Sequence, residues 1–450
     1  MMIAPRHIAR RLLVLAIFSA SSLAHGDNLL DIYNQAAEGD PQILAAAAAH
    51  RAAQEARPQS LAQLLPQVSA TASVAGNRQE VTDSIADSDE TFNSHGYALN
   101  LTQSVYHHDY YVQLRQAGSR IAQADAAYSA AVQDLIVRSA ALYFVALAAR
   151  DNQFFAHAER DAIARQLEQA KQRFDVGLIA ITDVQEAQAR YDLAVAQAIN
   201  ADDLLASSDE AVRELTGAQH DTLLALGETL PMLTPEPNDM AQWVDTSLKQ
   251  NLQLSAAQAA LRTAQDEVHR QRAGHLPSMD LVGSHGFEDV GGGAFFGARE
   301  STDSRIALRL NVPLFSGGLV SSRTREAVHL QEQSREQVEQ TRRATERQSR
   351  DAFRSVTASI STVNALKQAV ASNQIALEAA EAGNEVGTRT LVDVLDAQSN
   401  LYRAKRDYAR ARYDYVLSTL RLKQAAGMLS PKDLELINGY LTAAANDTTQ

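Results

Sequence analysis

Four stretches of this sequence alternate between apolar and polar residues. The alternation is clearest over about 96–106 and 304–315, and weaker over about 67–76 and 278–287. Side chains of a strand point to opposite faces in turn, so the pattern predicts strands with one apolar and one polar face. Each stretch has roughly the nine to eleven residues of a tilted strand that crosses a bilayer. The sequence therefore predicts two hairpins of membrane-length strands.

The segments inside the two hairpins, 77–95 and 288–304, are long and are polar or rich in glycine. We expect them to form loops on the outer side of a membrane. Phe295 and Phe296 lie in the second segment, where they are expected either to enter the membrane interface or to pack at the loop tip.

Long stretches without proline predict unusually long helices. Residues 108–174 and 316–382 are rich in Ala, Gln, Glu, Arg and Leu, which are strong helix formers. A helix of roughly 67 residues is on the order of 100 Å long, several times the usual length. Further helices are expected at the following residues: 182–216, 390–427, 28–57 and 239–272.

The second long helix changes character along its length. Its later part carries apolar residues at spacings of three and four, which predicts a coiled-coil seam. The seam consists of Phe353, Val356, Ile360, Val363, Val370 and Leu377. The earlier part, 321–350, is polar nearly all round and is supported by the i,i+4 pairs Glu339–Arg343 and Glu346–Arg350. A helix that is wet on two sides fits the wall of a water-filled tube.

The second half of the chain repeats the first about 210 residues later. Val176–Val184 returns as Val386–Val394, and Leu65–Pro66 returns as Leu276–Pro277. In each copy a Val-Gly pair follows the long helix, where glycine can take a left-handed conformation and end it. Each Val-Gly motif is therefore expected to form the tip of an antiparallel helical hairpin.

The N-terminus has the features of an export signal. Three arginines precede the apolar run 12–18, and small residues end at Ala24. We expect a signal peptide over 1–24 and a mature chain over 25–450, which has no cysteine for lipid attachment. The mature chain is expected to divide as follows: repeat one about 28–217, linker 218–238, repeat two about 239–427 and C-terminal tail 428–450.

The predicted strands imply an oligomer. The sequence after the signal contains no run of eighteen apolar residues, so membrane insertion is expected to use strands. Four strands cannot close, and lipid does not tolerate open sheet edges. Two chains would give eight strands around a filled interior, whereas a cyclic homotrimer would give twelve strands and a wider lumen. The net charge of −13 argues against nucleic-acid binding, which needs a basic face.

The motifs closely resemble the TolC family of outer-membrane efflux and secretion channels, over essentially the whole mature chain. The most specific matches are Val176–Val184, with Arg173–Phe174 before it, and Val386–Asp396. The segments Gly274–Pro277 and Pro313–Gly318 are also similar to the family.

This resemblance implies an α+β membrane protein of the Gram-negative outer membrane. Three chains with four strands each would form a twelve-stranded β-barrel, continuous with a long periplasmic α-helical barrel of coiled-coil hairpins. The short helices and the C-terminus would form an equatorial belt. The function implied is a passive exit duct for tripartite efflux pumps or type I protein secretion. Its periplasmic tip would open on docking a periplasmic adaptor protein and an inner-membrane ABC, RND or MFS transporter.

Asp393 and Asp396 are candidate residues of a pore constriction. They are three residues apart and so share one helix face. In a trimer they would form rings of carboxylates, which favour cations, and the resemblance implies this role. The alternative on spacing alone is two solvated aspartates near a helix start, where the helix dipole favours them.

The resemblance also implies a gate, in which contacts between the tips hold the periplasmic end closed. The matching positions are Thr182, Asp183, Asn384 and Arg389, and we expect Arg389 to pair with Asp183 of a neighbouring hairpin. The family has a tyrosine five residues before the arginine, where this chain has Asn384. The alternative is a solvent-exposed arginine, for which any ion pair would contribute under about 1 kcal/mol of stability.

The tips themselves are implied to dock the adaptor. The docking residues would be Val176, Gly177, Leu178, Val386, Gly387 and Thr388. The alternative is plain helix termination by glycine, which is compatible with docking. Thr182, Asp183 and Thr390 are in addition candidate N-cap residues of the returning helices.

No constellation in the sequence supports an enzyme, a cofactor or a metal site. His107–His108 lacks the spacing and glutamate of a zinc helix, and Gly291–Gly293 lacks the lysine of a phosphate loop. Asp87–Glu90 lacks the glycine of a calcium loop. The main alternative function is an exported coiled-coil protein without a pore, such as a surface adhesin. That alternative explains the long helices but not the matched strand hairpins.

Overall fold

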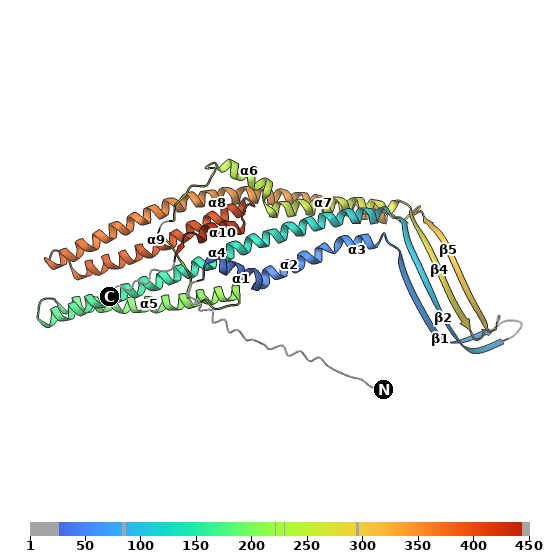
Figure 1. Cartoon of the computed structure of the whole chain (residues 1–450), viewed down its shortest axis with the longest axis horizontal. Helices are drawn as coiled ribbons and strands as arrows, with labels where there is room; N and C mark the ends of the chain where they lie inside the picture. Colours follow the sequence, from blue (N-terminus) through green and yellow to red (C-terminus); the bar gives the residue numbers. More distant parts are fainter. Residues whose placement is uncertain (1–26, 83–86, 221, 229, 294–296, 443–450) are drawn as a thin grey trace, which may run out of the picture.

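The computed structural model describes residues 27–82, 87–220, 222–228, 230–293 and 297–442. The chain is strongly elongated, with a sheet at one end and the tips of two helical hairpins at the other (Figure 1). The expected signal peptide 1–24, Phe295 and Phe296 lie outside the described residues.

The helices and strands follow the order expected for a duplicated chain. The helices are α1 Leu29–Gly39, α2 Pro41–Gln54, α3 Ala56–Ala62, α4 His108–Asp175, α5 Ile181–Thr216, α6 Met240–Gln250, α7 Leu252–Arg272, η1 Ala273–His275, α8 Leu319–Glu385, α9 Leu391–Ala425 and α10 Pro431–Asn438. The strands are β1 Gln67–Thr82, β2 Asp87–Tyr106, β3 Ala225–Leu226, β4 Ser278–Val290, β5 Arg299–Asn311 and β6 Leu441–Thr442.

The larger sheet is antiparallel, in the order β1-β2-β4-β5. Its register places Ala72 opposite Tyr97, Tyr97 opposite Phe287, and Phe287 opposite Thr302. Because side chains alternate along a strand, most of the large apolar residues of the four strands fall on one face. That face includes Val68, Val74, Leu99, Leu101, Leu281, Ile306, Leu308 and Leu310. The opposite face is polar and includes Ser69, Thr71, Ser73, Asn100, Ser284 and Arg305.

The strands are longer than the sequence pattern predicted. β1 has 16 residues and β2 has 20, so most of the predicted loop 77–95 is strand. β5 begins at Arg299 and ends at Asn311, so the strand predicted over 304–315 starts earlier and stops before Pro313. The prediction of a loop over 77–95 was wrong because cross-strand contacts stabilise polar strands; Arg78 Nη2, for example, lies 2.7 Å from Asp89 Oδ2.

The two long helices are confirmed. α4 has 68 residues and α8 has 67, and each turns back into a shorter helix to make the hairpins α4–α5 and α8–α9. The predicted seam of α8 is also confirmed, since Phe353, Val356, Val363 and Leu377 are buried. In the polar part of α8, both predicted pairs form: Glu339–Arg343 at 2.7 Å and Glu346–Arg350 at 3.1 Å.

The shorter helices break at equivalent positions of the two repeats. Asp40 ends α1 and accepts a hydrogen bond from the backbone of Gln42 at the start of α2. Asn251 ends α6 and accepts from the backbone of Leu254 at the start of α7. Asp and Asn side chains are favoured at the N-cap position of a helix, so a new helix begins directly after each break.

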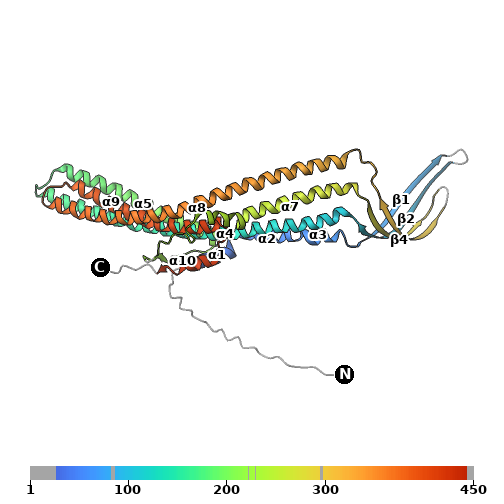
Figure 2. The ribbon, with the colours of Figure 1, turned by 90° about the horizontal axis from the view of Figure 1, so that it is seen from above.

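The largest apolar core lies at mid-length, where α1 and α10 lie beside the long helices (Figure 2). Its fully buried members include Leu29, Ile32, Tyr143, Phe144, Leu420 and Leu434. Among the described residues, α4 contains a stretch apolar enough to cross a membrane, but half of that stretch is buried inside the chain. Core packing therefore accounts for the apolar character of α4.

Candidate functional site

The two Val-Gly motifs form equivalent turns at the hairpin tips. Gly177 and Gly387 both have φ of 77°, a left-handed conformation that glycine adopts without strain. The Leu178 N–H donates to the Arg173 carbonyl at 2.9 Å, and the Thr388 N–H donates to the Gly383 carbonyl at 2.8 Å. These bonds span five residues, as in the motif that commonly ends helices. The duplicated sequence thus forms the same turn twice.

The helices after the turns start differently. Thr390 caps α9, since its side chain accepts from the Asp393 N–H and the Asp393 carboxylate accepts from the Thr390 N–H. α5 begins at Ile181 after Ala180, which provides no side-chain cap. The prediction that Thr182 and Asp183 cap the first return helix was therefore wrong, because the helix starts before them. The prediction for Thr390 is confirmed.

The expected docking residues are at the outermost points of the tips. Val176, Leu178 and Val386 are 70%, 73% and 75% exposed. This exposure leaves the tips accessible to a partner, as docking requires.

The two tips of one chain lie beside each other and enclose a groove of about 590 Å³. Arg173 at the end of α4 donates to the Asn384 side-chain oxygen at 3.3 Å. Asn384 in turn donates to the Arg389 carbonyl at 3.2 Å. Asn384 therefore joins the tip of repeat one to the tip of repeat two.

Arg389 and Asp183 both line this groove. Within the described part of a single chain, the carboxylate that Arg389 contacts is that of Asp393, at 4.0 Å. The expected pair between Arg389 and Asp183 of a neighbouring hairpin thus stays a prediction for the assembled protein.

Asp393 and Asp396 have separate partners. The Asp393 carboxylate accepts from the Thr390 backbone N–H at 2.9 Å and from the Thr390 hydroxyl at 2.8 Å. These hydrogen bonds hold the pKa of Asp393 below its usual value, the backbone bond being the larger cause. Asp396 on α9 forms an ion pair with Arg190 on α5, with 2.7 Å between Oδ1 and Nη2.

Sequence reasoning missed the contacts that join the two hairpins. Arg190 lies 206 residues from Asp396, and the pair Glu159–Arg406 joins α4 to α9 at 2.8 Å. Glu159 is only 4% exposed. A charged residue on the buried face of a predicted helix is the signal that could have identified Glu159, since buried charges are usually paired.

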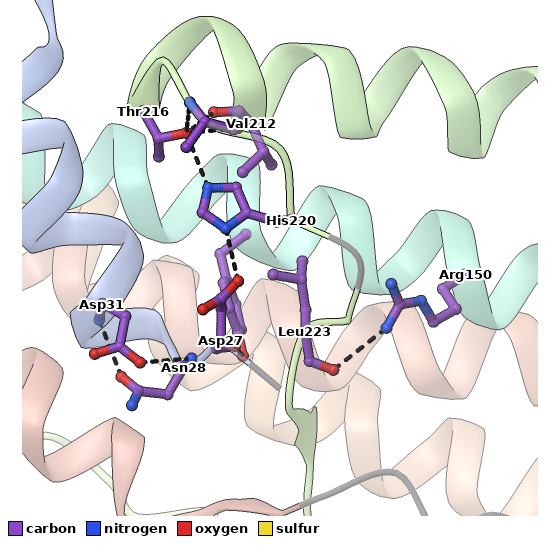
Figure 3. Close-up of polar contacts among 10 residues, drawn as sticks. Asp27, Asn28, Asp31, Arg150, Val212, Thr216, His220 and Leu223 are labelled. Atoms are coloured by element: carbon purple, nitrogen blue, oxygen red, sulfur yellow. Dashed lines mark hydrogen bonds and ion pairs between the residues drawn. The ribbon is translucent and has the colours of Figure 1, made fainter. Parts of the chain in front are cut away.

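A second polar cluster lies where the linker after α5 meets the start of the described chain (Figure 3). His220 Nε2 is 2.9 Å from Thr216 Oγ1, and His220 Nδ1 is 2.8 Å from Asp27 Oδ2. The order of groups is that of a hydrolase triad. However, Thr216 is buried and its hydroxyl donates to the Val212 carbonyl. The cluster therefore attaches Asp27 to the linker rather than presenting a nucleophile.

The two motifs that the sequence analysis weighed as possible metal sites contain residues that contact other protein groups. His107 stacks on Tyr110, and its Nε2 lies 3.0 Å from Asp280 Oδ1. Glu90 accepts from the Gly293 N–H at 3.0 Å. Within the part of the chain that the structure describes, no group of three or more potential metal ligands comes together.

Comparisons with known proteins agree with this architecture. The family model "Outer membrane efflux protein" matches residues 32–218 and 243–428. The chain is 39% identical over 431 residues to outer membrane protein TolC of Vibrio cholerae, covering 95% of this chain and 97% of that protein. It is 32% identical over 418 residues to the alkaline protease secretion protein AprF of Pseudomonas aeruginosa, covering 91% and 86%. The fold is similar to the CmeC outer membrane channel of Campylobacter jejuni, with TM-score 0.77, 18% identity, and coverage of 93% and 90%.

The family match falls on both repeats, which carry the two hairpin tips. The likeness to TolC spans nearly the whole of both chains. This chain is therefore a member of the outer membrane efflux protein family, the TolC family of outer-membrane export channels.

Proposed function

We propose that three copies of this chain form a passive exit duct across the Gram-negative outer membrane. The observation that carries the proposal is the four-stranded sheet, whose order leaves β1 and β5 at open edges. Lipid does not tolerate open edges, and one face of the sheet exposes Val74, Ile306 and Leu308. Pairing β5 of one copy with β1 of the next closes a barrel of twelve strands, with the apolar face toward lipid and the polar face toward the lumen.

The helical hairpins extend this duct into the periplasm. Helices α4 and α8 run from the sheet end to the tips, on the order of 100 Å at 1.5 Å per residue (Figure 1). The part 321–350 of α8 is mostly exposed in the single chain, as expected for a wall with neighbours and water on its faces. Short helices and the C-terminal segment at mid-length form the proposed equatorial belt.

The narrowest part of the duct is proposed at the tips. Asp393 and Asp396 line the constriction, and Thr182, Asp183, Asn384 and Arg389 form the gate. The contacts of Asn384 with Arg173 and with the Arg389 backbone support a closed resting arrangement, because they join two hairpins that must separate when the entrance widens.

The partners proposed are a periplasmic adaptor protein and an inner-membrane ABC, RND or MFS transporter. The relative AprF is named for the secretion of alkaline protease, which supports type I secretion beside efflux. The duct itself needs no cofactor and no catalytic residue, because the energy for transport comes from the inner-membrane partner.

Purified full-length protein in planar bilayers tests the duct. We expect a homotrimer with a discrete unit conductance. A monomer in detergent that forms no pore would contradict the duct and favour the non-conducting coiled-coil alternative.

Single cysteines test the docking surface, because the chain contains no cysteine of its own. Leu178→Cys and Thr388→Cys place a thiol at each tip without replacing the left-handed glycines. Ile199→Cys is the matched control, since Ile199 is 62% exposed but lies along α5 away from the tip. In intact cells we expect a thiol cross-linker to capture an adaptor from the tips only. Equal capture from Ile199, or none from the tips, would contradict docking at the tips.

A further inference from the structure

An ion pair joins the returning helices of the two repeats near the proposed constriction. Arg190 Nη2 of α5 lies 2.7 Å from Asp396 Oδ1 of α9. Glu186 stands four residues before Arg190 on the same helix, a spacing at which opposite charges can meet. The guanidinium group nevertheless contacts the other hairpin. Arg190 thus places a cation directly beside one of the two constriction aspartates.

The other aspartate also has a cation nearby, since Arg389 lies 4.0 Å from Asp393. Within these two pairs, two carboxylates and two guanidinium groups offset one another in formal charge. The groove beside them is lined by three further charged residues, Arg173, Asp183 and Glu385. Asp393 is in addition held by Thr390, so its position is fixed by the helix cap.

The arrangement depends on divergence between the repeats. At an offset of 210 residues, Arg190 of repeat one corresponds to Asn400 of repeat two, and Asp396 of repeat two corresponds to Glu186 of repeat one. The arginine and its partner aspartate therefore come from opposite repeats. Each chain supplies one such pair.

The ion pair matters for the charge that a permeating ion meets rather than for the folding stability of the protein. The two side chains are 43% and 49% exposed, and exposed pairs typically contribute under about 1 kcal/mol. A passing ion, however, senses all fixed charges within a Debye length, which is about 10 Å at 0.1 M salt. At 2.7 Å the two charges of this pair are much closer than that and are sensed together.

We propose that Arg190 is a selectivity-determining residue of the pore entrance: it neutralises Asp396 and leaves the constriction weakly charged. This inference rests on the proposed function, because it assumes that Asp396 faces the permeation path. It deepens that function by assigning the class of cargo. An entrance with balanced charges admits anionic solutes as well as cationic ones, whereas a bare double ring of aspartates would favour cations.

Reversal potentials of full-length trimers in planar bilayers under a tenfold KCl gradient test the inference. Arg190→Gln removes the cation, Asp396→Asn removes its partner, and a double variant removes both. Arg213→Gln is the control, because Arg213 also lies on α5 and is paired, at 2.8 Å with Glu210, but lies near the opposite end of that helix. Arg190→Lys keeps the charge and tests whether charge alone is sufficient.

We expect Arg190→Gln to shift the reversal potential toward the K⁺ equilibrium potential and Asp396→Asn to shift it toward that of Cl⁻. The double variant and Arg190→Lys should lie near the unsubstituted protein. The shifts should shrink when the experiment is repeated near 1 M salt, where the Debye length is about 3 Å.

Two failures are distinguishable. If the unsubstituted trimer forms no pore, the proposed function falls and this inference falls with it. If it conducts but Arg190→Gln behaves like Arg213→Gln, the duct stands and Arg190 has no role in selectivity. A double variant as cation-selective as Arg190→Gln would likewise overturn the role of the pair.

Discussion

The carboxylate of Glu159 on α4 lies 2.8 Å from Arg406 Nη1 on α9, in a position where the glutamate side chain is only 5% exposed. This ion pair is the most buried of the links between the two hairpins described above. It lies between the mid-length core and the tips, and it joins a helix of repeat one to a helix of repeat two.

Removing one partner of this pair should destabilise the protein. Arg406→Met leaves Glu159 buried without its cation, which costs about 3 to 5 kcal/mol for a fully buried pair. Since Arg406 is 21% exposed, we expect about 2 to 4 kcal/mol. Thermal unfolding of the detergent-solubilised protein measures the loss. The double variant Glu159→Leu with Arg406→Met should recover much of it, and Arg343→Met, at a 74% exposed side chain, should change little. A double variant no better than the single one would contradict this account.

The tip glycines should not tolerate a side chain. Gly177 and Gly387 have φ of 77°, and a Cβ at either position meets open space, so the cost of Gly→Ala is backbone strain alone. We expect about 1 kcal/mol or more for each substitution. Gly118→Ala is the matched control: its Cβ also meets open space, but Gly118 lies within α4, where alanine should stabilise by about 0.5 to 1 kcal/mol. Opposite signs for tip and helix are the expected result of unfolding measurements.

Acid should weaken the junction between α4 and α7. Burial alone would raise the pKa of Glu267, but hydrogen bonds from Arg270, Gln271 and Gln116 lower it to about 2. Because the pKa of Glu267 in the folded protein lies below its ordinary value of 4.5, this stabilisation is complete above about pH 4.5 and is lost as the pH falls toward 2. Glu267→Gln should therefore lower stability at neutral pH and less so near pH 2.

The control for the acid experiment is Glu339→Gln on the polar part of α8. Hydrogen bonds from Arg342 and Arg343 also lower the pKa of Glu339 to about 2, but its side chain is more exposed than that of Glu267, at 35% against 23%. Added salt should therefore weaken the effect of Glu339 more than that of Glu267. Equal salt sensitivity would show that the Glu267 cluster is not shielded from solvent.

Arg389 should help to hold the entrance closed. Arg389→Ala removes its guanidinium from the groove that it lines with Asp183. We expect a higher resting conductance of single trimers in planar bilayers, because a pair across hairpins is lost. Arg335→Ala, at a 69% exposed side chain of α8, should leave the conductance unchanged. An unaltered conductance for Arg389→Ala would remove Arg389 from the gate.

The sequence predicted those parts of the structure that depend on local pattern. Alternation located Tyr97, Leu99 and Leu101, and the Val-Gly motifs located both tips. The extension of β1 and β2 through Arg78 and Asp89 could not be predicted, because those strand residues are polar and depend on a partner strand. Stability there comes from pairing rather than from periodicity.

In the candidate site, too, only the residues that belong to a local sequence pattern could be predicted. Thr390 followed from its place before a helix and Asp393 from the repeated motif. The link between Arg190 and Asp396 did not follow, because it depends on how two hairpins 206 residues apart in sequence pack together. An arginine four residues after Glu186 gives no sign in the sequence that its partner lies on another helix.

The unequal strand hairpins give the outer mouth of the proposed trimer an uneven rim. β1 and β2 remain paired from Gln67–Thr102 to Thr82–Asp87, whereas the pairing of β4 with β5 stops at Val290–Arg299. Val290 lies opposite Ser94, which pairs with Ala75, so β1 stays paired with β2 over seven further residues, Gly76–Thr82. At about 3.3 Å per residue, the first hairpin therefore extends beyond the β4–β5 pairing by roughly 23 Å along the strands. In the proposed trimer, three long strand hairpins would then alternate with three short ones around the outer mouth. Material leaving such a mouth has sideways outlets, so a body resting on top of the rim would not seal it.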